Sequence, residues 1–473
     1  MNFKMNYEKY YGISAHIYWF GKIFKMIFSK CERLSTYLLI LIFGTSILFP
    51  NTSSAIILIK DAEIENSLQI IAKPIYKAAK IDHNSIKIIL IQDPNMNAFV
   101  LDNKNIFFTS GLLLKLKTPE MLQAVIAHEV AHISSGHLLK NSLNLNAIHN
   151  QTSLGLILGI IVASTLSTDA GLAISLGSKT AAQNKYFSHS RGQEVTADAI
   201  SIKLLQLAKI DPANAVNVID IFVQQEKILT LNQNTYSQTH PLSTKRTNNM
   251  TNIIKQIQKK EYHVDEKINY LHKRMLAKLS AFSENPADTL KKTALSETNE
   301  ISLLKRTIAL HLKPDPKNAF TTLRKLQKLK PQDPYFMELE GQMYLENGLP
   351  IKAIEAFSKA SKILPQEPTM LVWMGISHLA IGNKQNNITA LKVLKAAYDS
   401  DPVNPKMLKY LASAYALNGD MGQASLMTAE YFVLLGAFNA AIMHAKRAEK
   451  ILKPNSVGLQ RAKDILNISS KLE

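Results

Sequence analysis

The first half of the chain alternates short apolar runs with stretches of helical character. Residues 64–79 predict a helix, and residues 86–91 form a short run rich in β-branched residues that predicts a strand. Residues 97–101 and 105–109 flank the turn-rich spacer 102–104 and predict a hairpin. The edge of such a hairpin could pair with an extended peptide through main-chain hydrogen bonds, although a purely structural sheet fits the pattern as well.

Proline and glycine recur at a constant spacing in the second half of the chain. Three pairs lie 34 residues apart: Pro334 and Pro368, Gly341 and Gly375, and Gly348 and Gly382. A shared 34-residue period is typical of tetratricopeptide repeats, which stack into a curved α-solenoid. We expect the concave face of this solenoid to bind a polypeptide. The alternative is that the helices only brace the first half of the chain.

An apolar run over residues 37–49 follows a basic segment near the start of the chain. Small residues end at Ala55, which predicts a signal peptide over residues 1–55. The alternative is an uncleaved anchor. Residues 1–21 make the region before the apolar run unusually long, so Met26 is a candidate for the true start. In each case the bulk of the chain leaves the cytoplasm. The single cysteine, Cys31, precedes the apolar run, so the mature chain forms no disulfide.

The formal net charge of +18 by itself points to a nucleic-acid partner. The excess consists of 47 lysines against 8 arginines and follows a bias of the whole composition. Nucleic-acid sites favour arginine, whose planar fork grips phosphates and bases. We therefore expect no nucleic-acid partner. A basic surface leaves open a peripheral contact with anionic lipid headgroups.

The most informative motif is His128-Glu129-Val130-Ala131-His132, which lies in a stretch of helical character. Residues four apart on a helix share one face, so the two imidazoles point the same way and suit two ligands of one Zn²⁺. Glu129 lies close enough to take a proton from a water activated by the metal. The motif therefore predicts a hydrolytic zinc site.

A third zinc ligand is expected on a later helix, and Glu194 is the best candidate. Glu194 and Asp198 lie four residues apart and share a face. One can bind the metal while the other accepts the free N–H of a ligating histidine. Two acids on an exposed helix would only be solvated, but the apolar run 197–205 favours burial. Arg246 is expected to brace Asp198 or a developing oxyanion.

Two further histidines have different expected roles. His137 falls on another face of the first helix, and Leu138 occupies the place where a metzincin has its third histidine, so that class is excluded and His137 is expected to be structural. Pro241 keeps His240 out of helical geometry. His240 is expected to lie over the metal, where it stabilises an oxyanion or takes the fourth zinc position and closes the site. The alternative is a cap of the next helix.

Several motifs occur in one order along the chain. They are Asn97-Ala98-Phe99, the motif from His128 to His132, Ser190-Arg191 with Glu194, Ala197-Asp198, and His240-Pro241-Leu242. Over residues 60–255 they resemble the gluzincin family that includes the membrane prenyl-protein endopeptidases and their soluble bacterial relatives. The chain departs from the family at residues 102–104, where relatives tend to carry glycine. The departure affects the turn and not the chemistry.

The resemblance implies a role for each matching residue. It implies that His128, His132 and Glu194 are the zinc ligands. It further implies that Glu129 is the general base, and that Asp198 supports a ligating histidine. His240 would then be a residue of the catalytic site.

Residues 154–176 are very apolar, and the membrane-embedded relatives have spanning helices near this place. Asp169 interrupts the segment and glycine recurs through it. A charge near the middle of a membrane span is costly. We therefore favour a lid, or a loop that touches the membrane beside the active site, over a spanning helix.

The predicted fold is mainly α, with an α+β zincin-type metalloprotease domain that contains a small sheet, followed by an α-solenoid of tetratricopeptide repeats. The expected domains are a signal peptide over residues 1–55, a zinc metalloprotease domain over 56–264, a helical connection over 265–320, and the repeats over 321–473.

An exported gluzincin joined to such repeats resembles the periplasmic metalloproteases that assist and police β-barrel assembly in the outer membrane. The resemblance implies a periplasmic, Zn²⁺-dependent endopeptidase that degrades misassembled outer-membrane proteins and assists their assembly. Its implied partners, bound through the repeats, are unfolded or stalled outer-membrane proteins and the β-barrel assembly machinery. The alternatives are an assembly chaperone whose peptidase site is closed, and a membrane-embedded prenyl-type peptidase.

Overall fold

The computed structural model describes residues 57–100, 102–136, 190–228, 236, 239–257, 261–262, 265–294 and 296–469. The chain separates into two compact units, residues 1–54 and 55–473, and the described residues belong to the second. Three sequence predictions lie outside the described residues: the signal peptide, the role of His137, and the lid over residues 154–176. Within the described residues, no helix combines the length and the apolar character that a membrane span requires.

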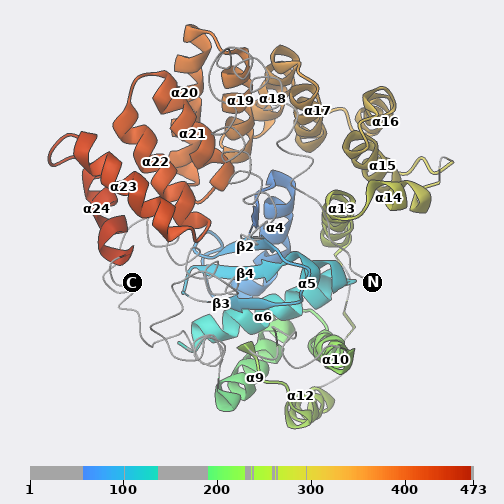
Figure 1. Cartoon of the computed structure of the whole chain (residues 1–473). Helices are drawn as coiled ribbons and strands as arrows, with labels where there is room; N and C mark the ends of the chain where they lie inside the picture. Colours follow the sequence, from blue (N-terminus) through green and yellow to red (C-terminus); the bar gives the residue numbers. More distant parts are fainter. Residues whose placement is uncertain are drawn as a thin grey trace, which may run out of the picture. The chain divides into compact units, whose positions relative to one another are not determined.

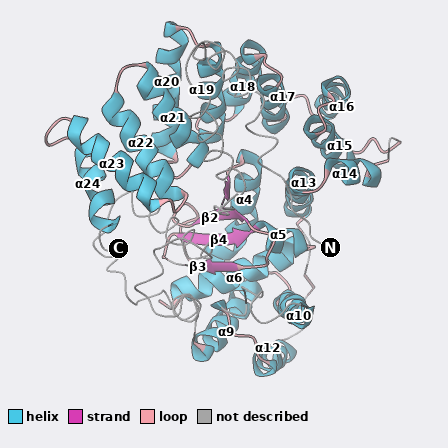
Figure 2. Ribbon diagram, viewed as in Figure 1, coloured by secondary structure: helices cyan, strands magenta, loops and turns pink. Residues whose placement is uncertain are grey.

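A small sheet forms the centre of the first half of the described chain (Figure 2). Its strands are β1 (Ile57–Ile59), β2 (Lys87–Gln92), β3 (Ala98–Val100) and β4 (Asn105–Thr109), in the order β1-β2-β4-β3. Strands β2 and β4 are parallel, and the other two pairs are antiparallel. The predicted hairpin is confirmed, because β3 pairs with β4 with Phe99 opposite Phe107. Strand β3 is therefore an edge strand.

Both faces of this sheet are buried, because its strands are apolar at consecutive positions. One face packs into a core with the surrounding helices and contributes Ile88, Leu90, Val100, Ile106 and Phe108. The other face belongs to an apolar cluster that continues into the repeats, and contributes Leu58, Ile89, Ile91, Phe99 and Phe107. The repeats therefore cover apolar sheet surface that water would otherwise reach.

Six helices of the described chain accompany the sheet (Figure 1). They are α4 (Ala62–Ala78), α5 (Ser110–Lys115), α6 (Pro119–Ser134), α9 (Arg191–Leu207), α10 (Ala213–Ile228) and α12 (Thr244–Gln256). Helix α6 packs against α4, α9 and α10, and α12 packs against α9. Helix α6 is thus surrounded by other elements, which explains why its side chains are buried on almost every face.

The rest of the described chain consists of antiparallel helices (Figure 1). Helices α13 (Glu266–Ser283) and α14 (Pro286–Lys292) come first. Then follow α15 (Glu300–Leu312), α16 (Pro316–Leu329), α17 (Pro334–Glu346), α18 (Pro350–Ile363), α19 (Pro368–Ile381), α20 (Lys384–Ser400), α21 (Pro405–Leu417), α22 (Met421–Leu434), α23 (Phe438–Ile451) and α24 (Val457–Ser469). Each of these ten helices packs against its neighbour in the chain. The predicted combination of an α+β domain and a helical repeat is confirmed.

The 34-residue period of glycine has two physical causes. Gly341 lies where helices α17 and α18 approach closely, since a Cβ atom there would stand 2.5 Å from the Phe357 ring. Gly375 meets the same constraint in the next repeat, against Leu394. Gly348 adopts a φ of +75° in the turn between the two helices, a conformation that is costly for residues with a side chain.

Consecutive antiparallel helices place their connecting turns on two opposite rims of the repeats. The inner rim consists of the turns at residues 330–333, 364–367, 401–404 and 435–437. The outer rim consists of the opposite turns together with the helix ends beside them, over residues 313–317, 347–352, 382–388, 417–421 and 450–457. The inner rim packs against the elements around the sheet. Lys60 Nζ lies 2.9 Å from Asp401 Oδ2, Arg274 of α13 donates to Asp333 Oδ1 at 2.8 Å, and Ala62 packs with Met370.

Candidate metal centre

Helix α6 carries the histidine motif and presents it to the interior. The helix begins after Thr118, whose side chain accepts a backbone N–H of the first turn, and Pro119 occupies a first-turn position where its missing N–H costs nothing. The four-residue spacing then brings His128 and His132 onto one face, beside α9. Both imidazoles and the Glu129 carboxylate are buried.

Helix α9 supplies the carboxylates. Ser190 caps its first turn and forms a capping box with Gln193, so the helix starts at a defined residue. Glu194 and Asp198 follow on the face that meets α6, and their exposed fractions are 0% and 3%. The expectation that this pair is buried is therefore confirmed. Such burial is costly for carboxylates unless cations or a metal compensate it.

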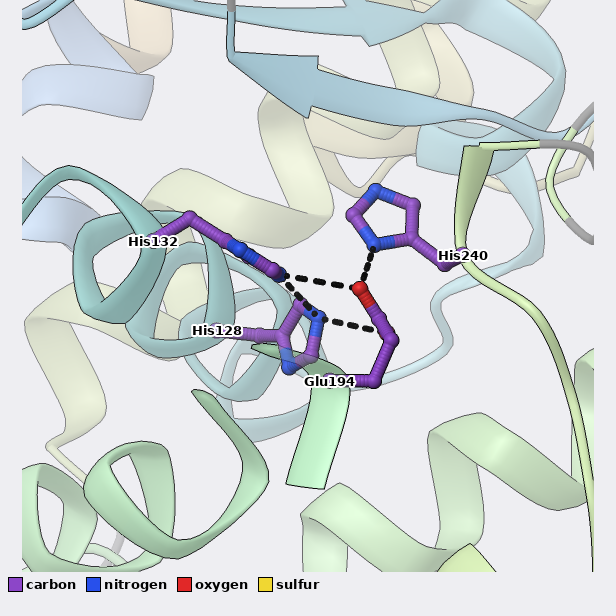
Figure 3. A group of neighbouring side chains, drawn as sticks. All are labelled: His128, His132, Glu194 and His240. Carbon is purple, nitrogen blue, oxygen red and sulfur yellow. Dashed lines mark hydrogen bonds and ion pairs between the residues drawn. The ribbon is translucent and has the colours of Figure 1, made fainter. Parts of the chain in front are cut away.

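The three predicted ligands converge on one point (Figure 3). Glu194 Oε1 lies 3.2 Å from His132 Nε2, and Glu194 Oε2 lies 3.5 Å from His128 Nε2. The two Nε2 atoms lie 3.1 Å apart. With His240 included, one donor atom from each of the four residues lies within 4.8 Å of all the others. The cluster thus unites helices α6 and α9 with the segment that precedes α12.

Glu129 stands beside this cluster without belonging to it. Its side chain is fully buried, and neither oxygen has a hydrogen-bond partner among the described residues. The imidazole of His240 lies beside it, with Nε2 3.6 Å from Oε1. Burial raises the pKa of Glu129, and the neighbouring imidazole of His240 acts in the opposite direction. A buried carboxylate with free acceptor positions is suited to exchange a proton with a bound reactant.

Asp198 and Arg246 form a charged support behind the cluster. Asp198 Oδ1 lies 3.2 Å from His128 Nδ1, which leaves His128 Nε2 to face the other ligands. Arg246 donates to both oxygens of Asp198 at 2.8 Å and lies 2.6 Å from Glu194. Burial alone would raise the pKa of Asp198, but hydrogen bonds from Arg246 and His128 outweigh it and hold that pKa below its ordinary value.

His240 lies inside the cluster and not at the cap of a helix, because Ser243 caps α12. His240 Nδ1 lies 3.0 Å from Glu194 Oε1, and Nε2 lies 3.1 Å from the carbonyl oxygen of Ala98 on the edge strand β3. Its ring stacks on Tyr236 with centroids 4.8 Å apart. His240 therefore connects the carboxylate of the cluster with the edge of the sheet.

Sequence reasoning named Asn97 only as part of a motif and did not identify Tyr236 and Thr239 as residues that hold His240 in place. Tyr236 stacks on both Phe222 and His240, and its carbonyl oxygen accepts the backbone N–H of His240 at 2.7 Å. The hydroxyl of Thr239 lies 3.1 Å from Asn97 Oδ1. No spacing in the sequence connects Asn97 with Thr239, since 142 residues separate them. A local signal was available for Tyr236, which lies four residues before His240.

The donor set fits a zinc ion. Zinc binds imidazole nitrogen and carboxylate oxygen, and catalytic sites offer three protein ligands and an open position. Here two imidazoles and the Glu194 carboxylate are buried within reach of one another, and the Glu129 carboxylate beside them lacks a hydrogen bond from the described residues. Arg246 neutralises only part of the negative charge of the buried carboxylates. A divalent cation at this point would compensate the rest.

Replacement of Arg246 is expected to destabilise the protein strongly. Arg246→Ala leaves the buried Asp198 carboxylate without its cationic partner, and breaking such a pair costs about 3–5 kcal/mol of unfolding free energy. Urea denaturation measures this loss. Arg191→Ala, at an exposed position at the start of α9, is the matched control. A loss no larger than that of the control would show that Arg246 does not hold the cluster together.

The residues of this cluster lie within one region that matches a known protein family. Residues 60–254 match the family model described as Peptidase family M48. The chain is 25% identical to the beta-barrel assembly-enhancing protease of Yersinia pestis over 358 residues, which cover 75% of this chain and 72% of that protein. It is 24% identical to the protein of the same name from Escherichia coli (strain K12) over 387 residues, which cover 80% and 78%. Among solved structures, the crystal structure of MamA is 19% identical with a TM-score of 0.27, and covers 35% of this chain and 93% of that chain.

Proposed function

We propose that the chain, whose residues 60–254 match the model of peptidase family M48, is a zinc-dependent metalloendopeptidase that degrades β-barrel outer-membrane proteins that fail to assemble. One observation carries the proposal. The Glu194 carboxylate of α9 lies within 3.5 Å of both imidazoles of α6, with the buried Glu129 beside them. This arrangement is suited to peptide hydrolysis.

In the proposed mechanism, His128, His132 and Glu194 hold the metal. Zinc bound there supplies a Lewis acid for the scissile carbonyl and for the attacking water. Glu129 accepts the proton of that water and delivers it to the leaving amine. Asp198 fixes the ring of His128, and an extended substrate hydrogen-bonds along the edge strand β3.

The position of His240 favours a second candidate function, an assembly chaperone whose peptidase site is closed. His240 lies against Glu194 and also against the Ala98 carbonyl of β3. In this arrangement His240 competes both for the metal position and for the main-chain group that an extended substrate would pair with. Cleavage would therefore require His240 to leave this position. The two candidate functions differ in whether His240 leaves this position when a client protein is bound.

We place the activity in the periplasm. The support is the name of the two similar proteins, which refers to β-barrel assembly. The repeats offer a surface for protein partners, and the partners that we propose are stalled outer-membrane proteins and the assembly machinery itself. Peptidase and repeats in one chain would bring a bound client close to the metal centre.

The test uses a denatured β-barrel outer-membrane protein as the substrate. We expect the wild-type chain to cleave it and to leave the same barrel intact after folding, since a folded barrel offers no extended segment. The Glu129→Gln chain should instead retain the uncut client. Electrophoresis and mass spectrometry of the products measure both. Equal rescue of barrel assembly by the two chains, without cleavage by either, would support the chaperone and contradict the protease.

A further inference from the structure

The outer rim of the repeats concentrates exposed aliphatic side chains. Among the described residues from 300 onward, ten large apolar side chains are exposed, and seven of them lie on this rim. The seven are Leu349, Ile351, Ile388, Leu417, Met421, Ile451 and Val457, with exposed fractions from 40% to 78%. They recur at four successive outer turns. Single exposed aliphatic residues are ordinary, but a row that repeats with the turns marks a contact surface.

The outer rim carries more lysines than acids. The outer rim carries six exposed lysines and two acids: Lys313, Lys317, Lys352, Lys384, Lys450 and Lys453, with Asp315 and Asp420. The inner-rim turns carry Asp333, Glu367, Asp401 and Lys330, and Lys328, Lys362 and Lys406 stand on the helix ends beside them. Asp333 and Asp401 already pair with Arg274 and Lys60. The outer rim is thus both basic and apolar, while two acids of the inner rim are paired within the chain.

We propose that the outer rim binds the surface of an anionic lipid bilayer. Aliphatic side chains at the tips of turns can enter the boundary between headgroups and acyl chains, while neighbouring lysines attract anionic headgroups. A groove for a peptide would gather its apolar residues in a concavity. Here they stand at separate turns, with lysines between them, which matches an extended charged surface. The contact would leave the inner rim and the metal centre in their present places.

The first experiment measures binding of the full chain to vesicles. The outer-rim variant combines Ile351→Ser, Ile388→Ser and Leu417→Ser, which change no charge. The matched control combines Leu329→Ser, Ile363→Ser and Met443→Ser, three exposed aliphatic residues off this rim. Vesicles contain phosphatidylcholine alone or mixed with phosphatidylglycerol. We expect the outer-rim variant to lose at least about tenfold in binding to the mixed vesicles. The control should bind like the wild type, and both should keep peptidase activity.

The dependence of binding on salt and on lipid composition distinguishes this contact from the general electrostatic attraction of a basic chain. Binding of the wild type should weaken with added salt and nearly vanish on phosphatidylcholine alone. The loss in the outer-rim variant should persist at every salt concentration, since its charge is unchanged. Equal binding of wild type and outer-rim variant would overturn the proposal. A rim that instead binds a protein partner would produce that same equality.

A local probe tests whether the rim itself touches the bilayer. In a Cys31→Ser background, Leu417→Cys and Met443→Cys each accept one environment-sensitive fluorophore. We expect a blue shift on mixed vesicles for the label at position 417 and none at position 443. Equal spectra at the two positions would show that another region of the chain carries the contact, and would overturn the proposal.

Discussion

The Glu129→Gln chain is expected to bind zinc like the wild type and to cleave peptides roughly 10² to 10⁴ times more slowly. The amide is nearly isosteric with the carboxylate but cannot accept the proton of the attacking water. Glu129 is fully buried and lies outside the predicted ligand set, so the ligands should keep their places. Single-turnover cleavage of a denatured substrate measures the rate, and metal analysis of the purified chain measures zinc.

Glu120→Gln is the control for this experiment, because Glu120 lies in the first turn of the same helix α6, away from the cluster. Its rate should equal that of the wild type. Undiminished cleavage by the Glu129→Gln chain would refute the proposed general base. Loss of zinc together with activity would instead indicate that Glu129 supports the ligand geometry.

The second large effect concerns metal affinity, which should fall in graded steps. Glu194→Gln removes the anionic ligand and is expected to weaken zinc binding by more than about 100-fold. Asp198→Asn keeps the ligands but weakens the support of His128, and changes of this kind cost roughly 10 to 100-fold. The expected order of affinities follows from the distances. Glu194 faces the Nε2 atoms of both histidines, whereas Asp198 reaches one of the two rings, at Nδ1 of His128.

Competition with a chromophoric chelator measures both affinities, and circular dichroism checks that each variant folds. Excess zinc should restore activity to the Asp198→Asn chain at a lower concentration than to the Glu194→Gln chain. The reverse order of affinities would exchange the roles of the two carboxylates, an assignment that the four-residue spacing alone left open. An unchanged affinity in both variants would exclude α9 from the metal centre.

Local geometry made some of the site predictable. His128 and His132 share a face in any helix that contains them, and capping by Thr118 and Ser190 determines where α6 and α9 begin. The repeat period was readable for a similar reason. Each repeat needs a small residue at the point where its two helices are closest. Gly341, which lies against the Phe357 ring, is such a residue.

The remaining features depend on contacts between distant segments. His240 lies 142 residues beyond Ala98, yet its imidazole reaches the carbonyl of that residue. The burial of Phe99 and Phe107 on the second face of the sheet, in a cluster shared with the repeats, likewise follows from packing. The sequence indicates which side chains lie on the same helix or strand, but not which helices and strands pack against one another.

The sequence by itself determined the residue types of the metal centre, the helix that carries two of its ligands and the presence of a helical repeat. The two histidines follow from a spacing of about one helical turn, and the repeat follows from a period of 34 residues. The tertiary structure alone decided that Arg246 joins both carboxylates, that His240 stands between the metal position and the edge strand, and that one rim of the repeats is left to solvent. Such pairings come from the packing of surfaces far apart in the chain, and no local pattern records them.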